Sequence, residues 1–355
     1  MSGAATGAVG HRSGILLVDK PQGITSHDAV ARTRRFAGTR KIGHAGTLDP
    51  MATGLLVLGL NSATRLLTYL VGLDKEYFAT IRLGSSTNTD DADGIELSRA
   101  PEGSAAAITE AQLATGIAAL SGEISQVPSS VSAIKIGGKR AYTLARAGDS
   151  VELASRRVTV PAFEVLSSRL AGDSSKGDFL DVDVRVECSS GTYIRALARD
   201  LGAALGVGGH LTALRRSRIG PFRVADAAEL ETMDVTTALI DPAAAAKLLF
   251  PAYVLSAQQA VDLSHGKRIV IEARDGGGPI AAIEPSGRLA GLLRLIGPVD
   301  STEASPIGQS DLLGRNQTGR NQTGPNQTGP NQSGDKPSRW LAKPLVNFPK
   351  DEGAE

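Results

Sequence analysis

The stretch KIGHAGTLDPMATG, residues 41–54, decides the interpretation of this chain. It holds one carboxylate, Asp49, and one histidine, His44, among three glycines and a proline. A segment so rich in glycine does not favour a regular helix, and it predicts a loop that presents a side chain to a substrate with the backbone close by. On composition alone, a turn in which Asp49 only satisfies local amides is the simpler interpretation. Neither common glycine-rich phosphate-binding pattern occurs in this stretch.

Three segments around this stretch predict strands. Residues 14–18 form a short apolar run that is typical of a buried strand entering a turn. Residues 75–83 and 181–188 alternate between apolar and polar side chains, as half-buried strands do. In both alternating segments we expect the apolar side chains to face the core.

Two further segments predict helices. Ser26 is suited to cap a helix over residues 26–37. Residues 194–205 have helical spacing of their apolar side chains, with Gly206 following as the C-cap. Because strands and helices are interspersed without a regular βαβ repeat, we expect an α+β domain with a mixed, mainly antiparallel sheet.

Length and composition indicate a globular protein of two domains. The chain has 355 residues, and domains average roughly 150 residues. Its 41% hydrophobic and 21% charged residues are typical of a soluble protein. The single cysteine, Cys188, excludes an internal disulfide and a cysteine zinc site, and on its alternating strand it is most simply a core residue. Since no targeting or membrane-spanning segment is visible, we expect a cytoplasmic location.

The net charge of +1 conceals opposite blocks along the chain. Residues 11–65 carry eight Lys or Arg against three acids, and residues 185–223 carry seven Arg against two acids. Between these blocks, residues 74–123 carry nine acids against three bases. The two basic blocks predict a positive face that attracts phosphate, and ordinary solvated surface is the alternative.

Beyond about residue 240, short apolar runs between glycine-rich turns predict a second, small β domain. A polar tract at residues 301–338 interrupts it with four copies of the pentapeptide Arg/Pro-Asn-Gln-Thr/Ser-Gly. Such a tract has almost nothing to bury, so we expect disorder there and a last strand at residues 340–348. The expected organisation is a flexible N-terminus over 1–13, a first domain over 14–240, a small domain over 248–349 containing the insertion, and a tail over 350–355.

Six ordered motifs carry a family resemblance. The segment GHAGTLDPMATGLLVLGLNSATRL, residues 43–66, resembles the catalytic motif of the bacterial TruB family, the tRNA pseudouridine-55 synthases. The resemblance is strong over residues 14–223, and residues 253–348 resemble more weakly the small β-rich PUA-like RNA-binding domain of that family. The other family blocks occur in the expected order, as LVDKPQGITS (17–26), DKEY (74–77), TDDADG (89–94), QVP with SAIK (126–135) and GTYIR (191–195).

The resemblance implies isomerisation of uridine 55 in the tRNA T loop to pseudouridine, without a cofactor. Asp49 would be the nucleophile that holds the intermediate while the base turns. Arg195 matches the arginine that pairs with this carboxylate in a forked geometry, lowering its pKa and aiming it. Tyr77 matches the tyrosine that stacks on the target base and whose hydroxyl serves proton transfer at C5.

The resemblance also assigns residues that bind the substrate. His44 matches the residue that fills the gap left by the flipped base, and Lys20 matches a lysine that supports the Asp49 loop. Tyr193 and Leu214 match further pocket residues. Without the resemblance, His44 would be an ordinary loop histidine. The basic insertion expected to grip the T loop contains Lys135, Lys139 and Arg140, for which a solvated loop is the alternative.

The expected partner is the T arm of tRNA, with no membrane, no obligate protein partner and a monomeric state. No metal is expected, because TDDADG lacks two principal ligands of a calcium loop. Two other functions stay open, a guide-dependent synthase of the dyskerin type and an RNA-binding helper of tRNA folding. Whether Asp49 attacks ribose C1′ or uracil C6 is also open.

Overall fold

The computed structural model describes residues 10–129, 153–172, 179–274, 277–299 and 338–351, together with the backbone of 135–136 and 139–140. The chain divides into two compact units, Met1–Ala245 with Lys350–Glu355, and Ala246–Pro349. The repeat tract predicted to be disordered lies, from residue 301 to 337, outside the described residues. Within the described ranges, no helix is both long enough and apolar enough to cross a membrane.

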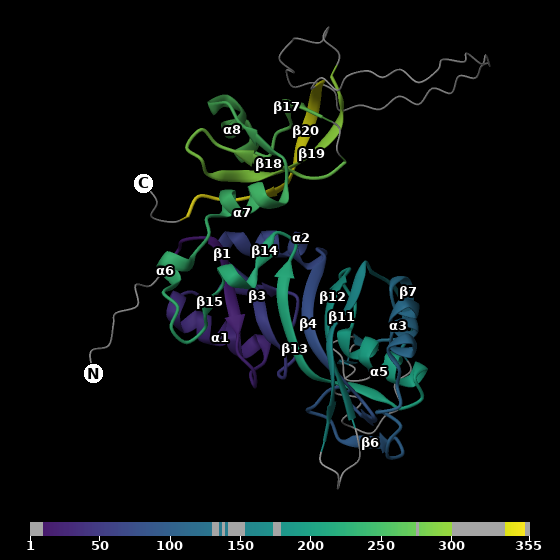
Figure 1. Ribbon diagram of the computed structural model, residues 1–355. Coiled ribbons are helices and arrows are strands. Elements are labelled where there is room, and N and C mark those ends of the chain that lie inside the picture. The colour runs from purple at the N-terminus through teal and green to yellow at the C-terminus, as the bar shows by residue number, and fades with distance from the viewer. Residues whose placement is uncertain are drawn as a thin grey trace, which may run out of the picture. The chain divides into compact units, whose positions relative to one another are not determined.

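In the described part of the first unit, nine strands form one sheet. Its order is β11-β12-β4-β13-β3-β1-β15, with β2 beside β3 and β14 beside β13 (Figure 1). The pairs β1–β15 and β3–β13 are parallel and the other pairs are antiparallel, which confirms the expected mixed, mainly antiparallel sheet. The strands are β1 (Gly14–Lys20), β2 (Ile42–Ala45), β3 (Thr53–Leu60), β4 (Lys75–Leu83), β11 (Ala162–Ala171), β12 (Phe179–Cys188), β13 (Gly209–Ile219), β14 (Phe222–Arg223) and β15 (Ala228–Glu229).

The helices and the short strands of this unit connect or cover the sheet. The helices are α1 (Ser26–Ala37), α2 (Leu67–Val71), α3 (Glu110–Ala119), α5 (Ile194–Ala204) and α6 (Val235–Ala238), with 3₁₀ turns η1 (Asn61–Leu66) and η2 (Val224–Asp226), and α7 (Pro242–Leu249) runs across the boundary of the units. The short strands pair as β5 (Ser85–Thr87) with β6 (Glu96–Arg99), β7 (Gly122–Gln126) with β10 (Arg156–Val160), and β8 (Lys135–Ile136) with β9 (Lys139–Arg140).

The alternating segments form strands as predicted, and their apolar faces build the core. On β4 and β12 the inward residues are buried, and they pack with Leu197 and Leu201 of α5. Cys188 is 1% exposed within this cluster, as expected for a core residue. The agreement between predicted and observed strands follows from the two-residue period of a strand, which places every second side chain on one face.

Two predicted helix caps are each displaced by one residue. Thr25, not Ser26, caps α1, because its hydroxyl accepts from the amide of Asp28 while the Asp28 carboxylate accepts from the amide of Thr25. Ser26 lies inside the helix and its hydroxyl instead bonds both backbone groups of Leu48, at 2.8 and 3.0 Å. At the end of α5, Leu205 is the cap and Gly206 follows it with a φ of +73°.

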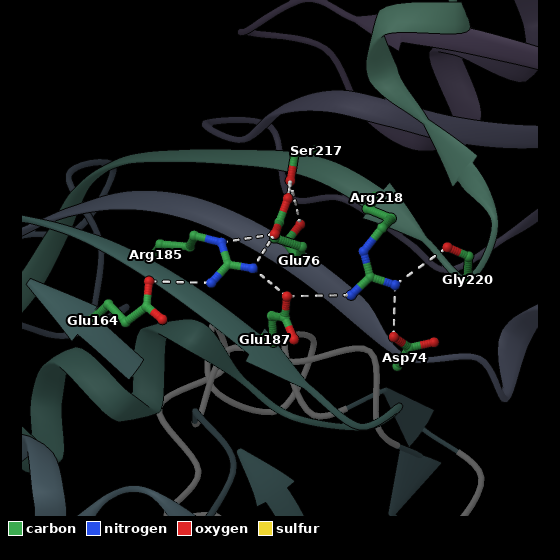
Figure 2. Close-up of polar contacts among 8 residues, drawn as sticks. All are labelled: Asp74, Glu76, Glu164, Arg185, Glu187, Ser217, Arg218 and Gly220. Atoms are coloured by element: carbon green, nitrogen blue, oxygen red, sulfur yellow. Dashed lines mark hydrogen bonds and ion pairs between the residues drawn. The ribbon is translucent and has the colours of Figure 1, made fainter. Parts of the chain in front are cut away.

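The outward face of the sheet is held by a network of ion pairs (Figure 2). Arg185 of β12 contacts Glu76 of β4 at 2.7 Å and Glu164 of β11 at 3.1 Å, and it also pairs with Glu187. Arg218 of β13 contacts Asp74 at 2.6 Å. The network therefore links four strands at the positions that flank Lys75 and Tyr77 on β4.

The described part of the second unit is a five-stranded sheet with one helix, α8 (Ala257–Ser264). The strand order is β16-β18-β19-β20-β17, so the last strand of the chain lies between two others. This confirms the strand predicted at residues 340–348. The strands are β16 (Ala252–Val254), β17 (Ile269–Ala273), β18 (Ile280–Ile283), β19 (Leu289–Pro298) and β20 (Ser338–Asn347).

Two residues near the ends of the described chain bond to each other within the first unit. The amide and hydroxyl of Ser13 donate to the carboxylate of Asp351, at 2.7 and 2.5 Å. Ser13 is 8% exposed and also bonds Ser62. The segments near the two ends of the described chain are thus joined by Ser13 and Asp351.

Candidate active site

A cavity of about 300 Å³ lies where the loop between β2 and β3 meets β4, β13 and the start of α5. The predicted residues Asp49, Tyr77, Tyr193, Arg195 and Leu214 all line it. Lys20 and His44 do not line it. The fold thus brings together five of the predicted residues from separate parts of the sequence and leaves two at the back of the loop.

The segment that carries Asp49 is a loop, as predicted, and it joins two paired strands. β2 and β3 pair antiparallel, and the amide of Ala52 donates to the Asp49 carbonyl at 3.1 Å. Gly54 has a φ of +101°, and a Cβ there would lie 2.3 Å from the carbonyl oxygen of Arg216. Only glycine permits this conformation and this approach, so part of the glycine richness is explained by the return of the chain into β3.

Arg195, the second residue of α5, reaches Asp49 and a second carboxylate at once. Its Nε lies 3.0 Å from Oδ2 of Asp49. Its Nη1 lies 3.2 Å from Oδ2 of Asp91 and 2.8 Å from the carbonyl of Thr89. The Arg195 side chain is 6% exposed, and a guanidinium bonded on two sides has a fixed plane. The orientation of Arg195 therefore depends on the 89–91 turn as well as on Asp49.

The pKa of Asp49 is raised overall, although the charge of Arg195 lowers it as expected. Burial raises it, the charge of Arg195 opposes this, and the charge of Asp91 adds to the rise. The Asp49 side chain keeps 39% of its surface exposed. A carboxylate with a raised pKa is more basic and hence a better nucleophile once it is ionised.

Tyr77 lies on β4, opposite Arg216 of β13 and Val186 of β12. It is 7% exposed. Burial raises the pKa of its phenol, so the hydroxyl keeps its proton across the physiological range. A protonated hydroxyl in the cavity wall can exchange a proton with a bound base.

Lys20 and His44 lie outside the cavity, and only Lys20 bonds to the Asp49 loop. Lys20 is fully buried, and its Nζ donates to the carbonyls of Ile24 at 2.8 Å and Pro50 at 3.5 Å. Burial lowers the pKa of Lys20 to about 8. The ring of His44 lies edge-on to His27, with 5.6 Å between centroids, and burial lowers the pKa of His44. Its Nδ1 is buried without a hydrogen-bond partner in the described structure.

The structure adds three charged residues that the sequence analysis did not single out. Asp91 holds Arg195, and Lys75 and Arg216 line the cavity. The Nζ of Lys75 donates to Leu73 at 2.7 Å and Val71 at 3.1 Å, and burial lowers its pKa to about 8. Asp91 lies in the TDDADG block, one of the family motifs, to which the sequence analysis gave no role in the site. Lys75 and Arg216 could be identified only from the structure, in which these charged side chains are buried on their strands.

The remaining predicted residues are described only in part. Lys135, Lys139 and Arg140 belong to the paired strands β8 and β9, but their side chains lie outside the described structure. Over the described ranges, no group of three or more His, Cys, Asp or Glu is arranged to hold a metal ion.

The cavity combines a carboxylate, an arginine in contact with it and a buried tyrosine hydroxyl, side chains that enzymes use for covalent and acid–base chemistry. Family models match along the chain, as TruB family pseudouridylate synthase (N terminal domain) over residues 34–194, tRNA pseudouridylate synthase B C-terminal domain over 195–260, and tRNA Pseudouridine synthase II, C terminal over 250–302.

Whole-protein comparisons agree with these matches. The chain is 60% identical over 287 residues to the tRNA pseudouridine synthase B of Leifsonia xyli subsp. xyli, spanning 80% of this chain and 93% of that protein. It is 56% identical to the protein of that name from Arthrobacter sp. strain FB24, over 79% of this chain and 92% of that protein. The chain belongs to the TruB family of pseudouridylate synthases.

The fold is shared with solved structures. A chain from the structure of an H/ACA RNP bound to a substrate RNA containing 2′-deoxyuridine aligns with a TM-score of 0.57 and 25% identity, over 80% of this chain and 78% of that chain. The comparisons confirm the α+β pseudouridine synthase fold with a small, β-rich, PUA-like C-terminal domain.

Proposed function

We propose that the chain converts uridine 55 in the T loop of tRNA to pseudouridine, with Asp49 as the nucleophile. The observation that carries the proposal is the contact between Asp49 and Arg195 inside a cavity whose wall includes Tyr77. A cavity of about 300 Å³ suits one nucleotide rather than a duplex, so the target base must leave its stack to enter it.

The reaction breaks the N1–C1′ bond, forms a C5–C1′ bond, moves a proton from C5 and leaves N1 protonated, so no atom is gained or lost. Ionised Asp49 forms the covalent bond that holds one fragment while the base turns, at ribose C1′ or at uracil C6. Arg195 aims the carboxylate. Tyr77 stacks on the base and places its hydroxyl for the proton transfer at C5.

The other predicted residues bind the RNA. Tyr193 and Leu214 are cavity walls for the base. His44 fills the gap left by the flipped base, and Lys20 supports the Asp49 loop through Pro50. The basic insertion with Lys135, Lys139 and Arg140 grips the T loop. We further propose that the protein acts in the cytoplasm as a monomer, with no cofactor, metal or obligate protein partner.

The direct test uses the purified chain alone with an unmodified tRNA transcript, followed by mapping of pseudouridine. We expect one new pseudouridine, at position 55, and the same product in a stem-loop of the T arm but not in an unfolded RNA of that composition. Asp49→Asn keeps the shape of the side chain and removes the nucleophile, so turnover should vanish while RNA affinity stays within a few-fold.

Other outcomes identify the alternatives. Activity that appears only when a guide RNA and partner proteins are added would support a guide-dependent synthase of the dyskerin type. Accelerated tRNA folding by the wild-type chain, without any pseudouridine, would support an RNA-binding folding helper instead. Substantial product from Asp49→Asn would remove Asp49 from its proposed role.

A further inference from the structure

Arg216 of β13 is one of the largest fully buried side chains in the described structure, at 1% exposure. Its three guanidinium nitrogens all donate to backbone carbonyls around the Asp49 turn. Nη2 donates to Gly46 at 2.9 Å and Nη1 to Thr47 at 3.4 Å, while Nε donates to Leu55 at 2.8 Å. One rigid, planar group therefore bonds the chain both before and after Asp49.

The backbone of Arg216 makes a second set of contacts with the same machinery. Arg216 pairs with Gly54 of β3 on one side and with Tyr77 of β4 on the other. Arg216 is therefore the residue of β13 that stands between the return of the Asp49 loop and the tyrosine of the cavity. A shift in its conformation would move both groups.

The charge of Arg216 is costly at this position. No carboxylate among the described residues lies within 4.0 Å of its guanidinium, so its burial is offset by neutral partners, the loop carbonyls and the Tyr77 hydroxyl. Its positive charge also disfavours the charged forms of Lys75 and His44 nearby. An apolar side chain of similar volume would fill this space without those costs, so a role in packing alone does not explain the arginine.

The opposite side of the loop is fixed by other groups. Ser26 bonds both backbone groups of Leu48, and the Pro50 carbonyl accepts from the amide of Gly23 at 2.8 Å. These contacts restrain residues 48 and 50, and Arg216 restrains residues 46, 47 and 55. Asp49 is the residue between them, and its own carboxylate is left for Arg195 and the substrate.

We propose that Arg216 is a positioning residue, which holds the loop before and after Asp49 so that the carboxylate meets Arg195 and the target nucleotide in the reactive geometry. This inference rests on the proposed function. It differs from the role of Arg195, because Arg216 acts on the backbone of the loop and makes no contact with the Asp49 side chain that is seen in the described structure.

The test compares Arg216→Lys and Arg216→Met with the neighbouring Arg215→Lys as control. Arg215 is 45% exposed and pairs with Asp19. Its replacement is the same arginine-to-lysine substitution, made at a residue that does not bond the loop carbonyls. We expect both Arg216 variants to lower the single-turnover rate of a T-arm stem-loop by about thirtyfold or more, with the dissociation constant changed less than about threefold. Arg215→Lys should keep a rate within about twofold of wild type.

Hydrogen exchange supplies a readout that is independent of turnover. In the Arg216 variants, peptides covering residues 44–55 should exchange faster while peptides of β12 and α5 stay protected. In Arg216→Ala, added methylguanidinium should restore part of the rate, and methylammonium at equal concentration should not, because only the planar cation can bond several carbonyls.

Three results would overturn the inference. One is a wild-type rate in Arg216→Lys, and another is a loss of RNA affinity equal to the loss of rate. The third is a loss of exchange protection in all peptides of the Arg216 variants, which would show that Arg216 is needed for folding and not for positioning the loop. An inactive wild-type chain would instead contradict the proposed function, so the two failures are distinguishable.

Discussion

Asp49 Oδ2 and Arg195 Nε lie 3.0 Å apart, although the loop and the helix that carry them are far apart in the sequence. The partner of the guanidinium on its other side is Asp91, at 3.2 Å. The arginine is thus held from behind by one carboxylate and presented to another. This arrangement fixes the direction from which positive charge reaches the nucleophile.

Replacement of Arg195 by lysine should lower the rate of pseudouridine formation by about a hundredfold, which corresponds to about 2.7 kcal/mol of barrier. A lysine ammonium is a point charge, and it cannot bond Asp49, Asp91 and the Thr89 carbonyl in one plane. Single-turnover kinetics with a T-arm stem-loop measure the effect.

Arg199→Lys is the matched control for this change. Arg199 lies one turn further along α5 and contacts Asp90, the neighbour of Asp91, at 3.3 Å. Its replacement perturbs the same loop and helix without touching the Asp49 contact, so a rate within about threefold of wild type is expected. Equal losses in both variants would mean that the loop anchorage matters and the Asp49 contact does not.

The acid side of the pH–rate profile should report Asp49. Burial raises the pKa of its carboxyl above the ordinary 3.8, so the nucleophile is protonated, and the rate lost, as the pH falls through a value above 3.8.

In Asp183, hydrogen bonds from Thr80, Ser167 and Arg169 overcome the effect of burial and lower the pKa. Its stabilising contribution is complete above its ordinary pKa, and it is lost as the pH falls from there through the lowered value.

The rate should therefore fall at a higher pH than the fold is lost. The measurement is a single-turnover rate series alongside circular dichroism on the same samples. Coincident midpoints would show that the acid limb reflects unfolding and not protonation of Asp49.

The basic insertion should contribute to RNA binding through phosphate contacts. Replacement of Lys139 and Arg140 by alanine should make the plot of log affinity against log salt shallower, because fewer counterions are released on binding. The control is Arg99→Ala with Arg169→Ala, which removes the same charge from residues that pair with Glu96 and Asp183. If the slope of the Lys139 and Arg140 variant equals that of the wild-type chain, these side chains do not contact the RNA backbone.

The parts of the fold that follow local rules were predictable from the sequence. The alternation of Val182, Val184 and Val186 depends only on the period of a strand, and all three are fully buried in β12. The Asp49–Arg195 pairing was implied by the resemblance and not by spacing. The Ser26 cap was wrong, since Thr25 and Ser26 are both good caps and the choice depends on Leu48, which is distant in sequence.

Local sequence patterns did not identify the charged residues buried in the site. Arg216 follows Arg215 in the sequence, and composition does not distinguish a fully buried arginine from one that is 45% exposed. Both arginines pair with β3 and β4, and they differ because successive side chains of a strand point to opposite faces, which puts Arg216 on the buried face that carries Tyr77. The raised pKa of Asp49 likewise depends on burial by segments far along the chain, which outweighs the nearby arginine.

The segment after the repeats should be essential to the second unit, whereas the repeats should not. β20 lies between β19 and β17, and its loss would leave β17 without a partner strand, open one edge of β19 and expose Leu293 and Ile271 of the core. A polar insertion before such a strand is tolerable, because the cost of closing a loop rises only by roughly 0.6 kcal/mol per doubling of its length.

Replacing residues 314–336 with a short Gly/Ser linker should therefore leave the melting temperature and the rate nearly unchanged. Ending the chain at Gly314 should instead lower the melting temperature of the second unit and weaken tRNA binding, because the strand that joins β17 to the rest of the sheet is removed. Thermal melts followed by calorimetry and binding titrations with full-length tRNA measure both effects. If the two variants melt and bind alike, residues 338–347 do not stabilise this sheet and the working domain ends near Pro298. If the linker variant alone loses affinity, the repeats themselves contact the RNA.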